Sequence, residues 1–119
     1  MKPLRSEAFA DAEPLRGRGH RAPATLAALA ARDRLLRETA RLYFAGLSDN
    51  EAAHRLHDAL ARYAGGGWRR ERAAEVCPAR YGGRLTAHCW RILKARDATP
   101  SARSVRRILA SGVDGAASR

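Results

Sequence analysis

The sequence predicts an all-α protein, a small bundle of about five helices. Three observations support this fold class. Apolar residues recur at intervals of three and four in several segments, as on one face of a helix. Glycine and proline residues separate these segments. Runs of alternating β-branched residues, which would indicate strands, are missing.

Length and composition indicate one small domain with tails. The chain has 119 residues, of which 26 are alanine, so few large side chains are left for a core. We expect a flexible, basic, disordered arm over residues 1–24, a single helical domain over residues 25–112 and a flexible tail over residues 113–119. Contact of the arm with phosphates or a minor groove is the alternative to plain disorder. The thin core favours a homodimer.

The apolar segments and the cysteines indicate where in the cell the protein is expected. It shows neither a signal-peptide core nor the roughly 20 apolar residues that span a bilayer, so we expect a cytoplasmic protein with no membrane contact. Arginine outnumbers lysine 21 to 2, which together with the alanine content is typical of GC-rich bacterial coding. Cys77 and Cys89 are not expected to form a disulfide in such a protein.

The net charge of +11 lies mainly in the C-terminal half. Residues 65–111 carry eleven basic and three acidic side chains, a net charge of +8, whereas residues 1–24 and 25–64 carry only +2 and +1. This asymmetry predicts an anionic partner on one side of the molecule.

Residues 25–45 are predicted to form the first helix, with Thr25 as the N-cap and Gly46 at its end. Its apolar residues cover more than half of the circumference, so the helix should be central in the bundle or shared with another subunit. These residues are Leu26, Leu29, Leu35, Leu36, Ala40, Leu42, Tyr43 and Phe44.

The second helix is predicted to follow Ser48, which forms a capping-box pattern with Glu51. Glycines 65–67 end this helix and permit a change of direction. Its apolar stripe consists of Ala53, Leu56, Leu60 and Tyr63.

A short helix is expected over residues 68–76, before Pro78. Trp68 is expected in the core because large apolar residues are scarce, with base stacking as the alternative. Arg69, Arg70 and Arg72 follow it and could hold phosphates in either case.

Residues 84–96 are predicted to form the fourth helix, with Arg91 and Lys94 on the side away from its apolar face. That face consists of Leu85, Cys89, Ile92 and Leu93.

The last helix is expected to start at Pro100 after a Thr99 cap and to end at Gly112. Ala102, Val105, Ile108 and Leu109 cluster on one side of it, within an arc of about 120°. On the opposite side lie Arg103, Arg106 and Arg107, flanked by small residues that let a backbone approach a DNA groove.

The stretch "PSARSVRRIL" resembles the recognition helix of bacterial helix-turn-helix DNA-binding proteins. With the helix before it, the resemblance covers roughly residues 84–111 and implies a C-terminal helix-turn-helix-like pair. By this resemblance Ser101, Arg103, Ser104 and Arg107 would face DNA, with Val105 and the two residues after Arg107 in the core.

These patterns predict a small basic protein that binds nucleic acid, with duplex DNA as the favoured ligand. A regulatory or accessory role would suit such a protein. The alternative is a helical adaptor that docks an acidic protein through its basic C-terminal half. RNA is less favoured because one tryptophan near the basic residues makes a poor stacking platform. The candidate nucleic-acid-binding residues are Arg69, Arg70, Arg72, Arg91, Lys94, Ser101, Arg103, Ser104, Arg106 and Arg107.

No catalytic residues, cofactor or metal are expected. The histidines and cysteines lack the tight C-x-x-C type of pair that zinc sites usually contain. No isolated pair of carboxylates, nucleophile with its base or P-loop pattern is present, so the protein is not predicted to be an enzyme.

Overall fold

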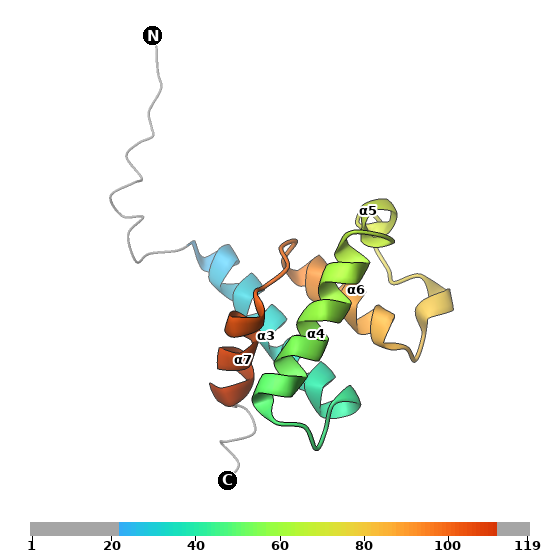
Figure 1. The fold of residues 1–119 in the computed structure, drawn as a ribbon. Coiled ribbons are helices and arrows are strands. Elements are labelled where there is room, and N and C mark those ends of the chain that lie inside the picture. The colour runs from blue at the N-terminus through green and yellow to red at the C-terminus, as the bar shows by residue number, and fades with distance from the viewer. Residues whose placement is uncertain (1–21, 112–119) are drawn as a thin grey trace.

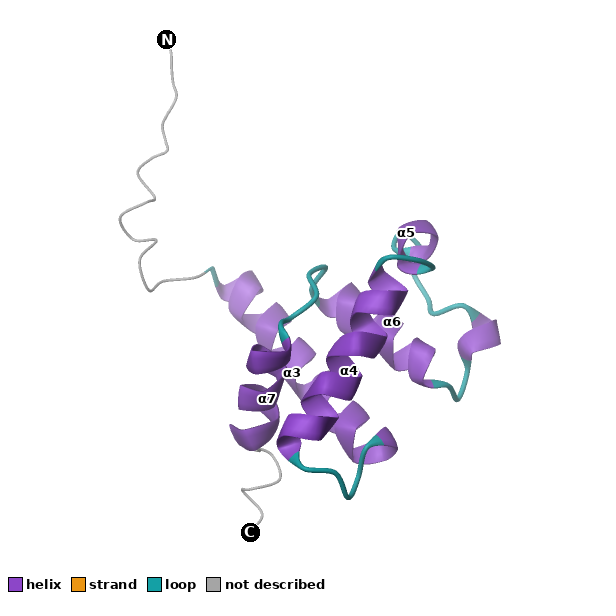
Figure 2. Ribbon diagram, in the orientation of Figure 1, coloured by secondary structure: helices purple, strands orange, loops and turns teal. Residues whose placement is uncertain are grey.

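The computed structural model describes residues 22–111, which form helices joined by loops, with no strand in this range (Figure 1). The predicted all-α fold class is confirmed, and Figure 2 shows the helices and their connections. The predictions for residues 1–21 and 112–119, including the helix end at Gly112, lie outside the described residues. The elements are α3 Pro23–Tyr43, α4 Asp49–Ala64, α5 Trp68–Glu71, the 3-10 helix η1 Ala79–Tyr81, α6 Leu85–Ala95 and α7 Ala102–Ser111.

The two C-terminal helices lie on different sides of the bundle. Both α6 and α7 pack against α3 and α4, and Figure 1 shows α7 on one side of α4 and α6 on the other. Packing of α6 directly against α7 is not among the main helix contacts, so the expected helix-turn-helix-like pairing is not confirmed. The loop between α6 and α7 instead carries the chain from one side of the bundle to the other.

The start of α4 agrees with the Ser48 half of the predicted capping box. Ser48 Oγ accepts a hydrogen bond from the Glu51 amide at 3.0 Å, which is the predicted N-cap. The Glu51 carboxylate accepts from Arg55 Nε at 2.8 Å, an i,i+4 pair on the exposed face.

Two other helix starts differ from the prediction. α3 begins at Pro23 and not after Thr25, because proline suits the first helical position, where no amide hydrogen is needed. α7 begins at Ala102, and its cap is Ser101, whose Oγ accepts from the Ser104 amide at 3.1 Å. The predicted Thr99 cap is therefore wrong.

The third helix is shorter than expected. α5 ends at Glu71, although the sequence pattern predicted a helix through residue 76. The Glu71 carbonyl accepts from the Ala74 amide at 3.1 Å and from Trp90 Nε1 at 3.2 Å. These bonds replace the bond from the amide of Glu75 that would continue an α-helix.

The core lies between the four longer helices and contains the predicted apolar stripe of α4 and most of those of α6 and α7. The predicted core residues Leu85, Ala102 and Leu109 are only partly buried. Trp68 belongs to the core with 4% of its surface exposed, as predicted. α3 contributes less than expected: Leu36 and Thr39 are buried, whereas Leu26 and Leu42 are 53% and 59% exposed. The core cluster consists of Leu36, Ala53, Leu56, Leu60, Tyr63, Trp68, Cys89, Trp90, Ile92, Leu93, Val105 and Ile108.

Candidate nucleic-acid interface

Helix α7 separates its apolar and basic residues onto different faces. Val105 is fully buried and Ile108 nearly so, and both belong to the core cluster. Arg103, Arg106 and Arg107 are exposed. Successive residues of a helix are turned by about 100° from each other. Because Val105 and Ile108 pack against α3 and α4, the three arginines point toward solvent.

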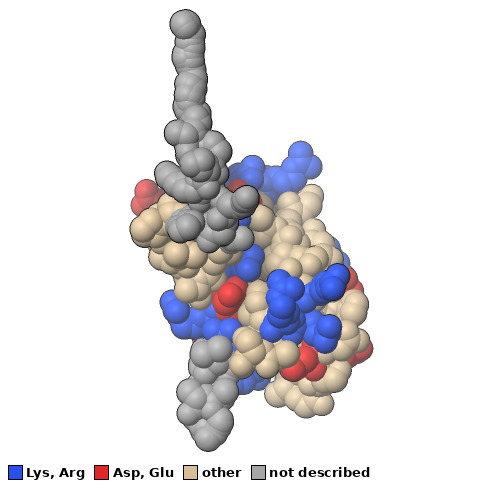
Figure 3. Space-filling model, turned by 90° about the vertical axis from the view of Figure 1, so that its left-hand side faces the viewer, with Lys and Arg blue, Asp and Glu red and all other residues tan. Residues whose placement is uncertain are grey.

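The charges of these three arginines are not neutralised by neighbouring acids. Within residues 22–111, no acidic side chain forms an ion pair with Arg103, Arg106 or Arg107. Figure 3 views the molecule from the side on which α7 lies and shows Lys and Arg side chains gathered there, with fewer Asp and Glu side chains between them. This face is therefore a source of positive potential.

The first turn of α7 is held in place by polar contacts. Ser101 caps the helix, and its Oγ also donates to Ser104 Oγ at 3.1 Å. Beside it, His57 Nδ1 of α4 lies 2.9 Å from the Pro100 carbonyl oxygen. The Ser101 hydroxyl, predicted to face DNA, thus has a structural role as the N-cap of α7, while the His57 contact joins this turn to α4.

The other predicted basic residues lie on α5 and α6, away from α7. Figure 1 shows α5 at the C-terminal end of α4, whereas α7 lies beside its N-terminal half. Arg69, Arg70 and Arg91 are exposed and form no ion pair with another described residue. The structure therefore divides the predicted site residues into two regions.

Two residues of the α5–α6 region already have partners within the protein. Arg72 Nη2 donates to Asp97 Oδ2 at 2.6 Å, and Lys94 Nζ donates to the Arg72 carbonyl at 2.7 Å. Asp97 also accepts from Trp68 Nε1 at 3.0 Å. The hydrogen bonds from Trp68 and Arg72 lower the pKa of Asp97, so this carboxylate is charged and joins α5 to the end of α6.

A buried carboxylate beneath α5 is a second polar centre that the sequence did not reveal. Glu71 accepts from Tyr63 Oη at 2.7 Å and from Tyr81 Oη at 3.0 Å, and it forms an ion pair with Arg80. Burial alone would raise the pKa of Glu71, but these hydrogen bonds and the charge of Arg80 hold it below its usual range. The cluster fastens η1 to α4, and all of its members are used in holding the fold.

Two arginines that were not among the predicted site residues lie beside α7. Arg32 of α3 and Arg96 after α6 line a hollow together with Ser104 and Arg107. The sequence carried one signal for Arg32: its spacing from Leu29 and Leu36 places a charge on the buried face of its helix. Arg96 gave no such signal because its position depends on where α6 ends.

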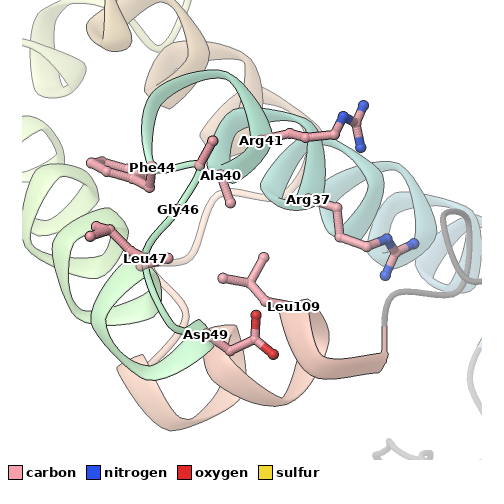
Figure 4. Close-up of a pocket in the computed structure, with 10 residues that line it drawn as sticks. Arg37, Ala40, Arg41, Phe44, Gly46, Leu47, Asp49 and Leu109 are labelled. Atoms are coloured by element: carbon pink, nitrogen blue, oxygen red, sulfur yellow. The ribbon is translucent and has the colours of Figure 1, made fainter.

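A further hollow lies where α3 ends, between that helix and the tip of α7. It is lined by the apolar residues Phe44, Leu47 and Leu109, with Arg37 and Arg41 extending outward at its edge (Figure 4). This mixed lining does not define one ligand chemistry.

The cysteines and histidines offer no metal-binding group among the described residues. Within residues 22–111, no three His, Cys, Asp or Glu side chains lie together as metal ligands would. Burial raises the pKa of the Cys89 thiol to about 11, so it stays protonated at neutral pH. Burial and the nearby Arg91 lower the pKa of His88.

Comparisons with protein-family models, with curated proteins and with solved structures find no match for this chain. None of the described helices is long and apolar enough to cross a membrane. Residues 22–111 thus form a small helical bundle in which α7 presents a strongly basic face.

Proposed function

We propose that this protein binds duplex DNA through the exposed face of α7. One observation carries the proposal: Arg103, Arg106 and Arg107 share the solvent face of a helix whose other face is core, and no described acid pairs with them. Arginine can neutralise phosphates and can donate two hydrogen bonds to a guanine edge in the major groove.

The burial of both described tryptophans favours a duplex over a single strand. Binding of single-stranded nucleic acid relies on exposed aromatic rings on which bases stack. Trp68 and Trp90 are buried in the core, at 4% and 6% exposure. Neither indole can serve as a stacking platform while the fold is intact.

Among the candidate residues, α7 is the centre of the proposed interface. Arg69, Arg70 and Arg91 are free to add phosphate contacts if a duplex extends toward α5. Arg72 and Lys94 contribute less in this proposal, because a phosphate would have to compete with their bonds inside the protein. As part of the same proposal, the protein has a regulatory or accessory role in the cytoplasm and does not act as an enzyme.

We further propose that the protein acts as a homodimer. Leu42, Tyr43 and Leu47 expose apolar surface at the C-terminal end of α3 and in the loop after it. A second copy would cover this surface and present two α7 helices to one duplex. Sedimentation at roughly tens of micromolar should then show about twice the 13.0 kDa chain mass, and Leu42→Glu should shift it toward the monomer. A parent protein that sediments only as a 13.0 kDa species contradicts the dimer.

Binding to a plain duplex at two salt concentrations tests the main proposal. With three phosphate contacts, affinity should fall by about 40-fold between about 50 and 200 mM salt. Polyglutamate of similar charge serves as the comparison. Absence of duplex binding at the lower salt, with tight binding to polyglutamate, would reject DNA and favour an acidic protein partner.

A further inference from the structure

The hollow between α3 and α7 brings together residues from three separate parts of the chain. Arg32 and Asp33 come from the N-terminal half of α3, Arg96 from the end of α6, and Ser104 and Arg107 from the first turns of α7. The hollow opens on the same side of the molecule as the basic face of α7, since Arg107 belongs to both.

Positive charge exceeds negative charge in this hollow. Arg32 donates from Nε and Nη2 to Asp33 Oδ1, at 3.2 and 3.1 Å, and these two charges balance. Arg96 and Arg107 form no ion pair with any other residue in the range 22–111. The hollow therefore has two guanidinium charges that are not compensated by an acid.

Partial burial makes this excess charge significant. Of the two uncompensated guanidinium groups, Arg96 is half-buried and Arg107 is exposed, and the paired Arg32 side chain beside them is only 13% exposed. Charges in such surroundings have lost part of their hydration, so an anion that completes them is bound more strongly than one at an open surface. A phosphodiester or phosphate group carries the charge and the acceptor oxygens that guanidinium groups recognise.

Ser104 adds a neutral donor at the rim. Its Oγ accepts from Ser101 Oγ, so its own hydroxyl hydrogen is available to an oxygen atom in the hollow. The N-cap bond from the Ser104 amide to Ser101 keeps this residue in place.

We propose that the hollow binds one phosphate group, and that in a duplex complex this is a backbone phosphate beside the groove that α7 enters. This inference rests on the proposed DNA binding and adds Arg32 and Arg96 to the interface. A fixed phosphate at this point would set the position and angle of α7 relative to the bases.

The first test uses inorganic phosphate alone. Nε–Hε signals of the arginine side chains are followed by NMR while phosphate replaces chloride at constant ionic strength. The signals of Arg32, Arg96 and Arg107 should shift with one common saturation curve. Arg34, which lies about 200° from Arg32 on the same helix, is the control. If the hollow arginines do not shift, or shift no more than Arg34, the phosphate site is wrong.

The second test uses duplex DNA and matched variants. Arg96→Gln should lower duplex affinity by about tenfold and reduce the slope of log K against log salt by about 0.9. Arg34→Gln removes the same charge and should have a clearly smaller effect. Asp33→Asn should raise the affinity, and by more than the control Asp58→Asn on α4, because it removes the carboxylate in the hollow.

The outcomes separate this site from the wider proposal. If Arg103→Ala weakens duplex binding but Arg96→Gln acts only as Arg34→Gln does, the hollow is rejected and the α7 interface stands. If the parent protein does not bind duplex at all, the α7 proposal is rejected, and the phosphate titration decides whether the hollow is an anion site.

Discussion

The two basic regions of this molecule differ in what their side chains already contact. On α5 and α6, Arg72 and Lys94 are bonded to Asp97 and to a backbone carbonyl, and Arg80 is paired with Glu71. On α7, by contrast, none of the three arginines has an acidic partner within the described chain. Arg69, Arg70 and Arg91 in the α5–α6 region also lack an ion pair with another described residue, so the difference concerns Arg72, Arg80 and Lys94. The comparison shows that basic side chains of one sequence can serve either to hold a fold or to receive an anion.

The largest expected loss of stability comes from the buried carboxylate of the first region. Glu71→Ala removes the acceptor of the Tyr63 and Tyr81 hydroxyls and should lower the free energy of unfolding by about 3 kcal/mol. Urea denaturation followed by circular dichroism measures it. Glu75→Ala, at an exposed residue in the loop that follows α5, should change stability by under about 0.5 kcal/mol. Equal effects of the two variants would show that the cluster does not stabilise the fold.

A smaller loss is expected from the core face of α7. Val105 is fully buried, so Val105→Ala should cost about 2 kcal/mol of unfolding free energy through lost packing. Duplex affinity should stay close to that of the parent at temperatures where the variant is folded. A variant that is fully folded yet cannot bind would mean that Val105 faces the ligand and that the two faces of α7 are wrongly assigned.

As the pH falls, the α5–α6 region, which Glu71 and Asp97 hold together, should lose stability before α7 does. The pKa values of Glu71 and Asp97 are lowered in the folded protein, so their contribution to stability is present above about pH 4, the unfolded value. It is lost as the pH falls through the lower folded values. Thermal melts between about pH 6 and 3 should therefore show a steeper decline for the parent than for Glu71→Gln. Parallel declines would contradict the role given to Glu71.

A still smaller loss of stability is expected for the exposed ion pair between Arg72 and Asp97. The Arg72 and Asp97 side chains are about half exposed, so Arg72→Ala should cost less than about 1 kcal/mol. Its effect on duplex affinity should also be smaller than that of Arg103→Ala, because Arg72 is already engaged. If Arg72→Ala weakens binding as much as Arg103→Ala, the two regions act as one interface.

Local features of the fold were predictable from the sequence. The Ser48 cap and the apolar stripe of α4 depend on residues within one or two turns of each other, and both are as expected. The division of α7 into a core face and a basic face follows from helical spacing alone. The class of fold and the exposed arginines could therefore be read before the structure.

Features that depend on distant residues could not be predicted in this way. α5 ends early in part because the indole of Trp90, nineteen positions after Glu71, donates a hydrogen bond to the Glu71 carbonyl. Arg72 is engaged by Asp97, twenty-five positions away. The hollow beside α7 is lined by residues of α3, of α7 and of the segment after α6, and helical spacing does not specify how these parts of the chain meet.

The salt dependence of duplex binding by a triple variant tests the central claim most directly. Replacement of Arg103, Arg106 and Arg107 by alanine should leave the circular dichroism spectrum and melting temperature nearly unchanged, since all three are exposed. Duplex affinity should fall, and the slope of log K against log salt should decrease by about 2.7, or about 0.9 for each contact. A second triple variant at Arg34, Arg55 and Arg62 removes the same charge elsewhere and should lose much less. If the folded α7 variant binds duplex with the affinity and salt slope of the parent, α7 does not contact DNA.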